Sequence, residues 1–151
     1  MPPNTKFQAV ADLEQAVGNS DIIITVTPSY QPLIQKNWVK EGTHFSCIGA
    51  DMAGKQEIDE AIFTDAKLFV DDMEQAIHVG ECEIPIKKGS IQKDSILGEI
   101  GEVILGQKPG RSDEKEITIF DSTGIALQDL ICAKLLLDLA TEKNLGTIAE
   151  L

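Results

Sequence analysis

Residues 21–26 constrain the fold more than any other part of the chain. They read Asp-Ile-Ile-Ile-Thr-Val, and the next three residues, Thr27, Pro28 and Ser29, interrupt the apolar run. β-branched side chains favour extended backbone, and an almost unbroken apolar run is typical of a strand buried on both faces of a parallel sheet. We therefore expect such a strand here, within a sheet that extends beyond it.

Strand-like and helix-like segments alternate along the rest of the chain. A short apolar run stands at 7–10, and further strands are predicted at 44–48, 67–70 and 117–120. The spacing of apolar and capping residues predicts helices at 12–17, 56–63, 72–79, 96–105 and 126–141. Strands separated by helices indicate crossover connections, so an α/β fold with a parallel sheet flanked by helices is predicted. The last helix is so apolar that we expect most of its surface to be buried.

Length and composition exclude several classes of protein. The 151 residues suit one domain, and 42% apolar with 25% charged residues excludes an intrinsically disordered chain. No apolar stretch approaches the roughly 20 residues that cross a bilayer, and the first residues lack the apolar core of a secretory signal. We expect a cytoplasmic protein without a membrane partner. The net charge of -12 has the wrong sign for nucleic acid and is typical of a surface that aids solubility.

The cysteines and histidines give no sign of a metal site. Cys47, Cys82 and Cys132 show no C-x-x-C spacing, and His44 and His78 do not stand at the spacing of metal ligands. We expect reduced cysteines that serve packing, and no bound metal.

Three loops follow predicted strands, where open parallel sheets bind their ligands; they are residues 25–29, 48–55 and 121–124. The second loop comes close to the phosphate-binding pattern G-x-x-x-x-G-K, but Gln56 stands where that pattern has the Ser or Thr that holds magnesium. Asp51 within the loop would repel a triphosphate, which disfavours this interpretation. The structural alternative is a tight strand-to-helix turn in which Asp51 caps the helix and Lys55 is solvated.

The sequence contains no G-x-G-x-x-G, so these residues alone do not define a dinucleotide site. Residues 21–29, 42–57 and 120–129, in this order, nevertheless resemble the ornithine cyclodeaminase/mu-crystallin family, and the likeness runs from about residue 12 to about residue 140. The stretches GADMAGKQE and FDSTGIALQD look most like the alanine dehydrogenase branch. The resemblance implies a Rossmann-type fold in a homodimeric enzyme that uses NAD or NADP on an amino acid or cyclic imine.

The resemblance also implies roles for individual residues. Asp51 matches the family's catalytic aspartate, which lies beside the nicotinamide and acts as a general acid or base; this suits hydride transfer, which leaves a proton to be moved. Cofactor contacts fall on Thr27, Ile48, Gly49, Ala50, Asp51, Lys55 and Ser122, and substrate contacts on Asp51 and Thr123.

The resemblance has one large gap. The family's glycine-rich loop, its first two Rossmann strands and its substrate-binding lysine, arginine and glutamate precede anything that matches here. We therefore expect residues 1–151 to form one domain: the C-terminal part of a dinucleotide-binding domain (about 6–125) and a C-terminal helix (about 126–151). The alternatives to a portion of an enzyme are a non-catalytic, crystallin-like protein that binds a nucleotide or another ligand, and an inactive fragment.

Overall fold

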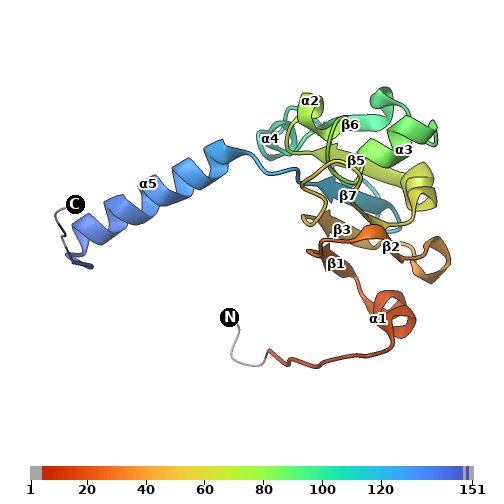
Figure 1. Ribbon diagram of the computed structural model, residues 1–151, viewed down its shortest axis with the longest axis horizontal. Coiled ribbons are helices and arrows are strands. Elements are labelled where there is room, and N and C mark those ends of the chain that lie inside the picture. Colours follow the sequence, from red (N-terminus) through yellow and green to blue (C-terminus); the bar gives the residue numbers. More distant parts are fainter. Residues whose placement is uncertain (1–4, 148, 150–151) are drawn as a thin grey trace.

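The computed structural model describes residues 5–147 and residue 149. Within them, five strands form a sheet in the order β1-β3-β7-β5-β6, and every pairing in it is parallel. The strands are β1 (Ile22–Thr25), β3 (His44–Cys47), β5 (Ala66–Val70), β6 (Ile96–Glu99) and β7 (Ile117–Asp121). Figure 1 shows β6 at the top of the sheet and β1 at the bottom. The predicted parallel α/β architecture and four of its strands are confirmed.

The connections carry short helices and a second, two-stranded parallel sheet made of β2 (Tyr30–Ile34) and β4 (Gln56–Ile58). The α-helices are α1 (Leu13–Asn19), α2 (Met73–Ala76), α3 (Glu83–Lys88), α4 (Ile100–Ile104) and α5 (Ala126–Glu142), and the 3-10 helices are η1 (Lys36–Trp38), η2 (Glu60–Asp65) and η3 (Lys93–Ser95). Asp12 and Asp72 cap α1 and α2 by accepting hydrogen bonds from backbone N–H groups three residues on, as their positions in the sequence predict.

Side chains alternate between the two faces of the sheet along each strand, and the core residues that these strands contribute come from one of these faces. Ile119 of β7 stands in register between Phe45 of β3 and Leu68 of β5, and all three are fully buried. On the opposite face, Ile22 and Ile24 of β1 are 66% and 64% exposed. The expectation that β1 is buried on both faces is therefore wrong within the described chain, in which β1 is an edge strand paired with β3.

Two predicted helices need correction. Residues 56–63 are the strand β4 followed by η2, because this segment pairs with β2 instead of coiling. Asp51 consequently caps no helix. Residues 96–105 are the strand β6 followed by α4, with Ile96 and Gly98 turned inward at the two-residue period of a strand. The run at 7–10 has no regular structure and is exposed.

The C-terminal helix α5 projects from the body of the molecule (Figure 1). It has no buried residue, and Leu130 and Leu137 are 66% and 68% exposed. The expected burial of this helix is thus wrong within the described chain. Cys132 on α5 is exposed too, whereas Cys47 and Cys82 are buried in the core. None of the helices in the described residues is both long enough and apolar enough to span a membrane.

Candidate functional site

The three strand-end loops lie side by side because β1, β3 and β7 are neighbours and all run in the same direction. Backbone hydrogen bonds join them. The Gly49 N–H donates to the Thr25 carbonyl at 3.1 Å, and the Ser122 N–H donates to the Cys47 carbonyl at 2.8 Å. The loop after β3 is therefore fixed between the loops after β1 and β7, as predicted for loops at the carboxyl ends of neighbouring parallel strands.

A hollow of about 290 Å³ opens between the first two loops. Its lining residues are Val26, Thr27, Pro28, Ile48, Gly49, Asp51 and Lys55. Five of the residues predicted for the site thus meet around one space. Ala50 does not line it, since only 1% of its surface is exposed. Val26 and Ile48, which are 65% and 39% exposed, give the hollow an apolar surface beside its polar groups.

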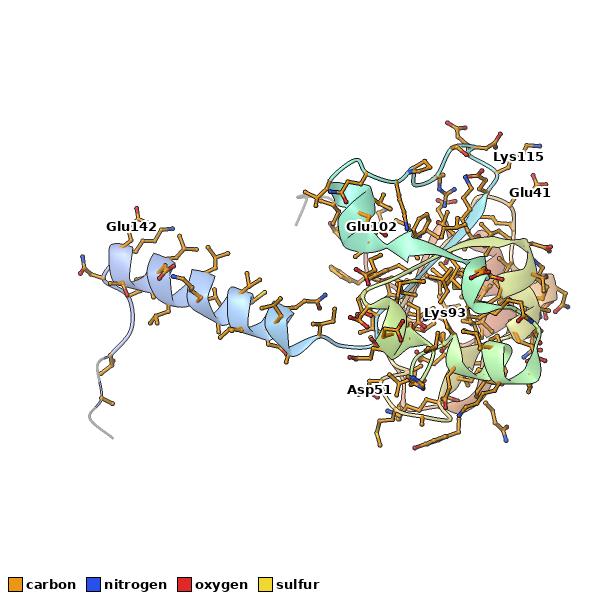
Figure 2. All side chains as sticks on the ribbon, turned by 90° about the horizontal axis from the view of Figure 1, so that it is seen from above. Glu41, Asp51, Lys93, Glu102, Lys115 and Glu142 are labelled. Carbon is orange, nitrogen blue, oxygen red and sulfur yellow. The ribbon has the colours of Figure 1, made fainter. Side chains whose placement is uncertain are left out.

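Asp51 and Lys55 form an ion pair at the edge of this hollow. The Lys55 Nζ lies 2.5 Å from the Asp51 Oδ1, and the Asp51 side chain is 57% exposed while that of Lys55 is 11% exposed. The hydrogen bond from Lys55 holds the pKa of Asp51 below its ordinary value. Figure 2 shows Asp51 at the margin of the body, on the side from which α5 departs. The carboxylate is therefore ionised at neutral pH, reachable from solvent, and oriented by a buried lysine.

The same geometry argues against a phosphate-binding loop at residues 49–55. The Lys55 ammonium group, which would contact phosphate, is held by Asp51. The loop leads into the strand β4 instead of a helix, so no helix N-terminus follows it to attract an anion.

The loop after β7 is held from the interior by Asp71, the residue directly after β5. Its carboxylate accepts hydrogen bonds from the N–H groups of Thr123 (2.8 Å) and Gly124 (3.0 Å). It also accepts from the hydroxyls of Thr123 (2.8 Å) and Ser122 (3.2 Å). Thr123 is only 4% exposed. The structure therefore directs the Thr123 hydroxyl toward Asp71, and neither Ser122 nor Thr123 lines the hollow at Asp51.

Sequence reasoning missed a group of buried carboxylates behind these loops. Glu57, Glu81, Glu83 and Asp121 all have 0% of their surface exposed. Burial raises the pKa of Glu81 to about 8 and that of Asp121 to about 6. Glu83 accepts a hydrogen bond from the Gly54 N–H at 2.6 Å and pairs with Lys87. For Asp121 a signal was available, since it ends the apolar segment 117–120, where a charged residue requires backbone donors.

The parallel sheet makes this chain an open α/β protein, and the hollow lies at the carboxyl ends of its strands, the edge at which ligands bind in this class of fold. Sequence comparison gives the family. Residues 3–144 match the ornithine cyclodeaminase/mu-crystallin family, and the chain belongs to it. The resemblance carried by the three strand-end motifs is thereby confirmed.

Several relatives are close in sequence and structure. The chain is 50% identical over 127 residues to an alanine dehydrogenase of Archaeoglobus fulgidus, covering 84% of this chain and 39% of that protein. An archaeal alanine dehydrogenase dimer with bound NAD superposes with a TM-score of 0.86 at 46% identity, over 94% of this chain and 44% of that one. The pyrroline-2-carboxylate reductase of Thermococcus litoralis, in complex with NADH and L-proline, superposes at 0.87 with 35% identity, over 93% and 44%. The chain therefore spans less than half the length of these relatives.

Proposed function

We propose that this chain forms part of an NAD(P)-dependent enzyme that transfers hydride at an amino acid or a cyclic imine. In this proposal the five-stranded sheet is the later portion of a Rossmann-type sheet, without the first strands and the glycine-rich loop. The observation that carries the proposal is the meeting of Thr27, Ile48, Gly49, Asp51 and Lys55 around one hollow, in a chain of this family. Relatives that contain bound NAD or NADH support the choice of cofactor.

The residues around the hollow fit a nicotinamide group. Val26 and Ile48 offer exposed apolar surface on which a flat ring can lie, and the Thr27 hydroxyl and Asp51 carboxylate offer polar partners at its rim. Gly49 and Lys55 complete the cofactor contacts, with Ala50 supporting the loop and Ser122 supplying a contact from the neighbouring loop. When bound, the nicotinamide cofactor carries the hydride.

In the proposed mechanism this chain handles the proton. Asp51 accepts or returns a proton at the substrate or at a water molecule, and Lys55 fixes the carboxylate in place and keeps it ionised until then. Thr123 is proposed to act on the substrate side through its loop. Because Asp51 is open to solvent in the described chain, the exclusion of water that favours such chemistry has to come from a further segment or a second subunit. A homodimer, as in the archaeal relative, would be one source of such cover.

One observation favours a binding function without turnover. The pKa of Asp51 is lowered by Lys55, so the free carboxylate is a weak base near neutral pH. A crystallin-like protein that binds a nucleotide or another ligand would use the same hollow. Substitution of Asp51 separates the two functions, because it removes turnover from an enzyme and leaves ligand binding largely intact.

The proposal is tested by calorimetric titration of the chain with NADH, NADPH and Mg-ATP. We expect weak binding of a nicotinamide dinucleotide that does not respond to magnesium, since Gln56 replaces the residue that would hold the metal. The affinity is weak because the pyrophosphate contacts of a glycine-rich turn are not encoded in these residues. Tight, magnesium-dependent binding of ATP would refute the proposal.

A further inference from the structure

One buried side chain connects two of the strand-end loops directly. Glu57, on β4, accepts a hydrogen bond from the Thr27 N–H at its Oε1 (2.6 Å) and from the Gly49 N–H at its Oε2 (3.1 Å). Thr27 and Gly49 both line the hollow beside Asp51, whereas Glu57 has no exposed surface. Each oxygen of a single carboxylate thus holds the backbone of a different loop.

The two loops approach so closely that the arrangement leaves no room for a side chain at Gly49. A Cβ there would lie 2.6 Å from the Thr27 nitrogen, and it would also collide with the Thr27 carbonyl and the Glu57 carboxylate. Backbone donors this close to each other need acceptors between them, because a buried N–H without a partner is costly. A carboxylate provides two acceptor oxygens and no donor, which suits two facing N–H groups.

The backbone of Glu57 is itself held by Glu81. Its own N–H donates to the Glu81 Oε1 at 2.6 Å, and the Ile58 N–H donates more weakly to the Glu81 Oε2 at 3.4 Å. Glu81 is fully buried, so the strand that carries Glu57 has little freedom to move relative to the core. Glu57 therefore transmits the position of a rigid strand to two loops that carry the exposed residues of the hollow.

We propose that Glu57 is a positioning residue that sets the spacing between the Thr27 loop and the Gly49 loop, and with it the shape of the cofactor hollow. The inference rests on the proposed function for the identity of the ligand, and it acts through the backbone instead of through contact with the cofactor. Removing one acceptor oxygen should leave the Thr27 N–H unpaired, or leave the Gly49 N–H with the Thr25 carbonyl alone. The loops should then separate, and binding at the hollow should weaken while the sheet stays folded.

The test compares Glu57→Gln with Glu74→Gln in the 151-residue chain labelled with ¹⁵N. Gln has the shape of Glu, but its NH₂ group would face a backbone N–H, so one of the two hydrogen bonds is lost. Glu74 is a matched control because its side chain is 78% exposed, is paired with Lys93 and lies outside the hollow. Both substitutions remove one negative charge.

We expect Glu57→Gln to move the amide proton signals of Thr27 and Gly49 upfield, to keep the amide pattern of the five-stranded sheet, and to weaken NADH binding about tenfold or more. Glu74→Gln should stay within about twofold of the unmodified chain. A folded Glu57→Gln variant that binds NADH as the unmodified chain does would overturn the inference. So would Thr27 and Gly49 signals that do not move.

This design distinguishes a failure of the proposed function from a failure of the inference about Glu57. If the unmodified chain binds neither NADH nor NADPH, the proposed function fails for this chain, and the two amide signals still decide whether Glu57 sets the loops. If Glu57→Gln does not fold, hydrogen exchange of the unmodified chain decides. The Thr27 amide should then exchange slowly despite its exposed loop, and rapid exchange would contradict the inference.

Discussion

Glu81 should make this protein less stable as the pH rises through neutrality. The carboxyl group is fully buried, and the loss of hydration raises its pKa from the ordinary 4.5 to about 8. Nearby carboxylates of Asp121 and Glu57 raise the pKa further, while hydrogen bonds from the Glu57 and Ile58 N–H groups lower it. The folded chain therefore keeps a proton on Glu81 at pH values where the unfolded chain has released it.

The direction in which stability changes with pH follows from this difference in bound protons. Between about pH 4.5 and about pH 8 the folded state holds more protons than the unfolded state, so its stability is complete at the acid end and is lost toward pH 8. One proton corresponds to about 1.4 kcal/mol per pH unit, so the step from about pH 5 to about pH 7 should cost about 3 kcal/mol from this group. Burial raises the pKa of Asp121 to about 6, which adds a smaller effect of the same sign.

The assay is urea unfolding followed by the fluorescence of Trp38, the single tryptophan, which packs partly buried against the core. Glu81→Gln is the comparison, because glutamine resembles the protonated acid and cannot ionise. The difference in unfolding free energy between the two proteins largely cancels His44, whose pKa burial lowers and whose contribution therefore has the opposite sign. We expect the free energy of unfolding of Glu81→Gln to increase relative to that of the unmodified protein as the pH rises from about 5 to 8. A difference that does not change with pH would refute the reasoning.

Three further predictions concern other parts of the molecule. In a full-length enzyme with this sequence, Asp51→Asn should lower turnover by about two to four orders of magnitude and retain cofactor binding, as steady-state kinetics and titration will report; unchanged turnover would exclude an acid–base role. Asp71→Asn should reduce the free energy of unfolding by about 2–4 kcal/mol in urea, since an amide cannot accept all the donors of residues 122–124; a loss below about 1 kcal/mol would contradict this. Light scattering should find a dimer or larger species at micromolar concentration, and Leu130→Glu with Leu137→Glu should shift it toward monomer; a monomeric unmodified chain would contradict the apolar surface of α5 as a contact.

The strands of the main sheet could be predicted where the local sequence by itself favours extended backbone. Residues 21–26 and 117–120 are β-branched runs that end in turn residues, and they form β1 and β7. The helices predicted at 56–63 and 96–105 were wrong because both segments begin as strands. Their first residues become extended through pairing with β2 and β5, which lie far away in the sequence, and single-segment periodicity contains no information on such partners.

The exposed residues that line the hollow could be predicted, whereas the buried residues that hold their loops in place could not. Thr27, Ile48, Gly49 and Asp51 follow strands directly, so the rule that parallel strands present their carboxyl ends at one edge was enough to bring them together. Ala50 belongs to the same loop but is buried, because a turn directs successive side chains to different sides. The contacts of Asp71 with residues 122–124 span some fifty positions, and only the folded sheet brings them together.

The buried carboxylates also change the meaning of the acidic composition. Among the described residues, Glu57, Asp71, Glu81, Glu83 and Asp121 are buried, so part of the acidic composition behind the formal net charge of -12 does not serve solubility at all. A buried carboxylate is costly unless donors surround it, and here the donors are backbone N–H groups, many of them from the loops after β1, β3 and β7. The loops that carry the proposed binding residues lie outside the regular hydrogen bonding of the sheet. The carboxylates replace it from the interior, which leaves the outer surface of each loop free for a ligand.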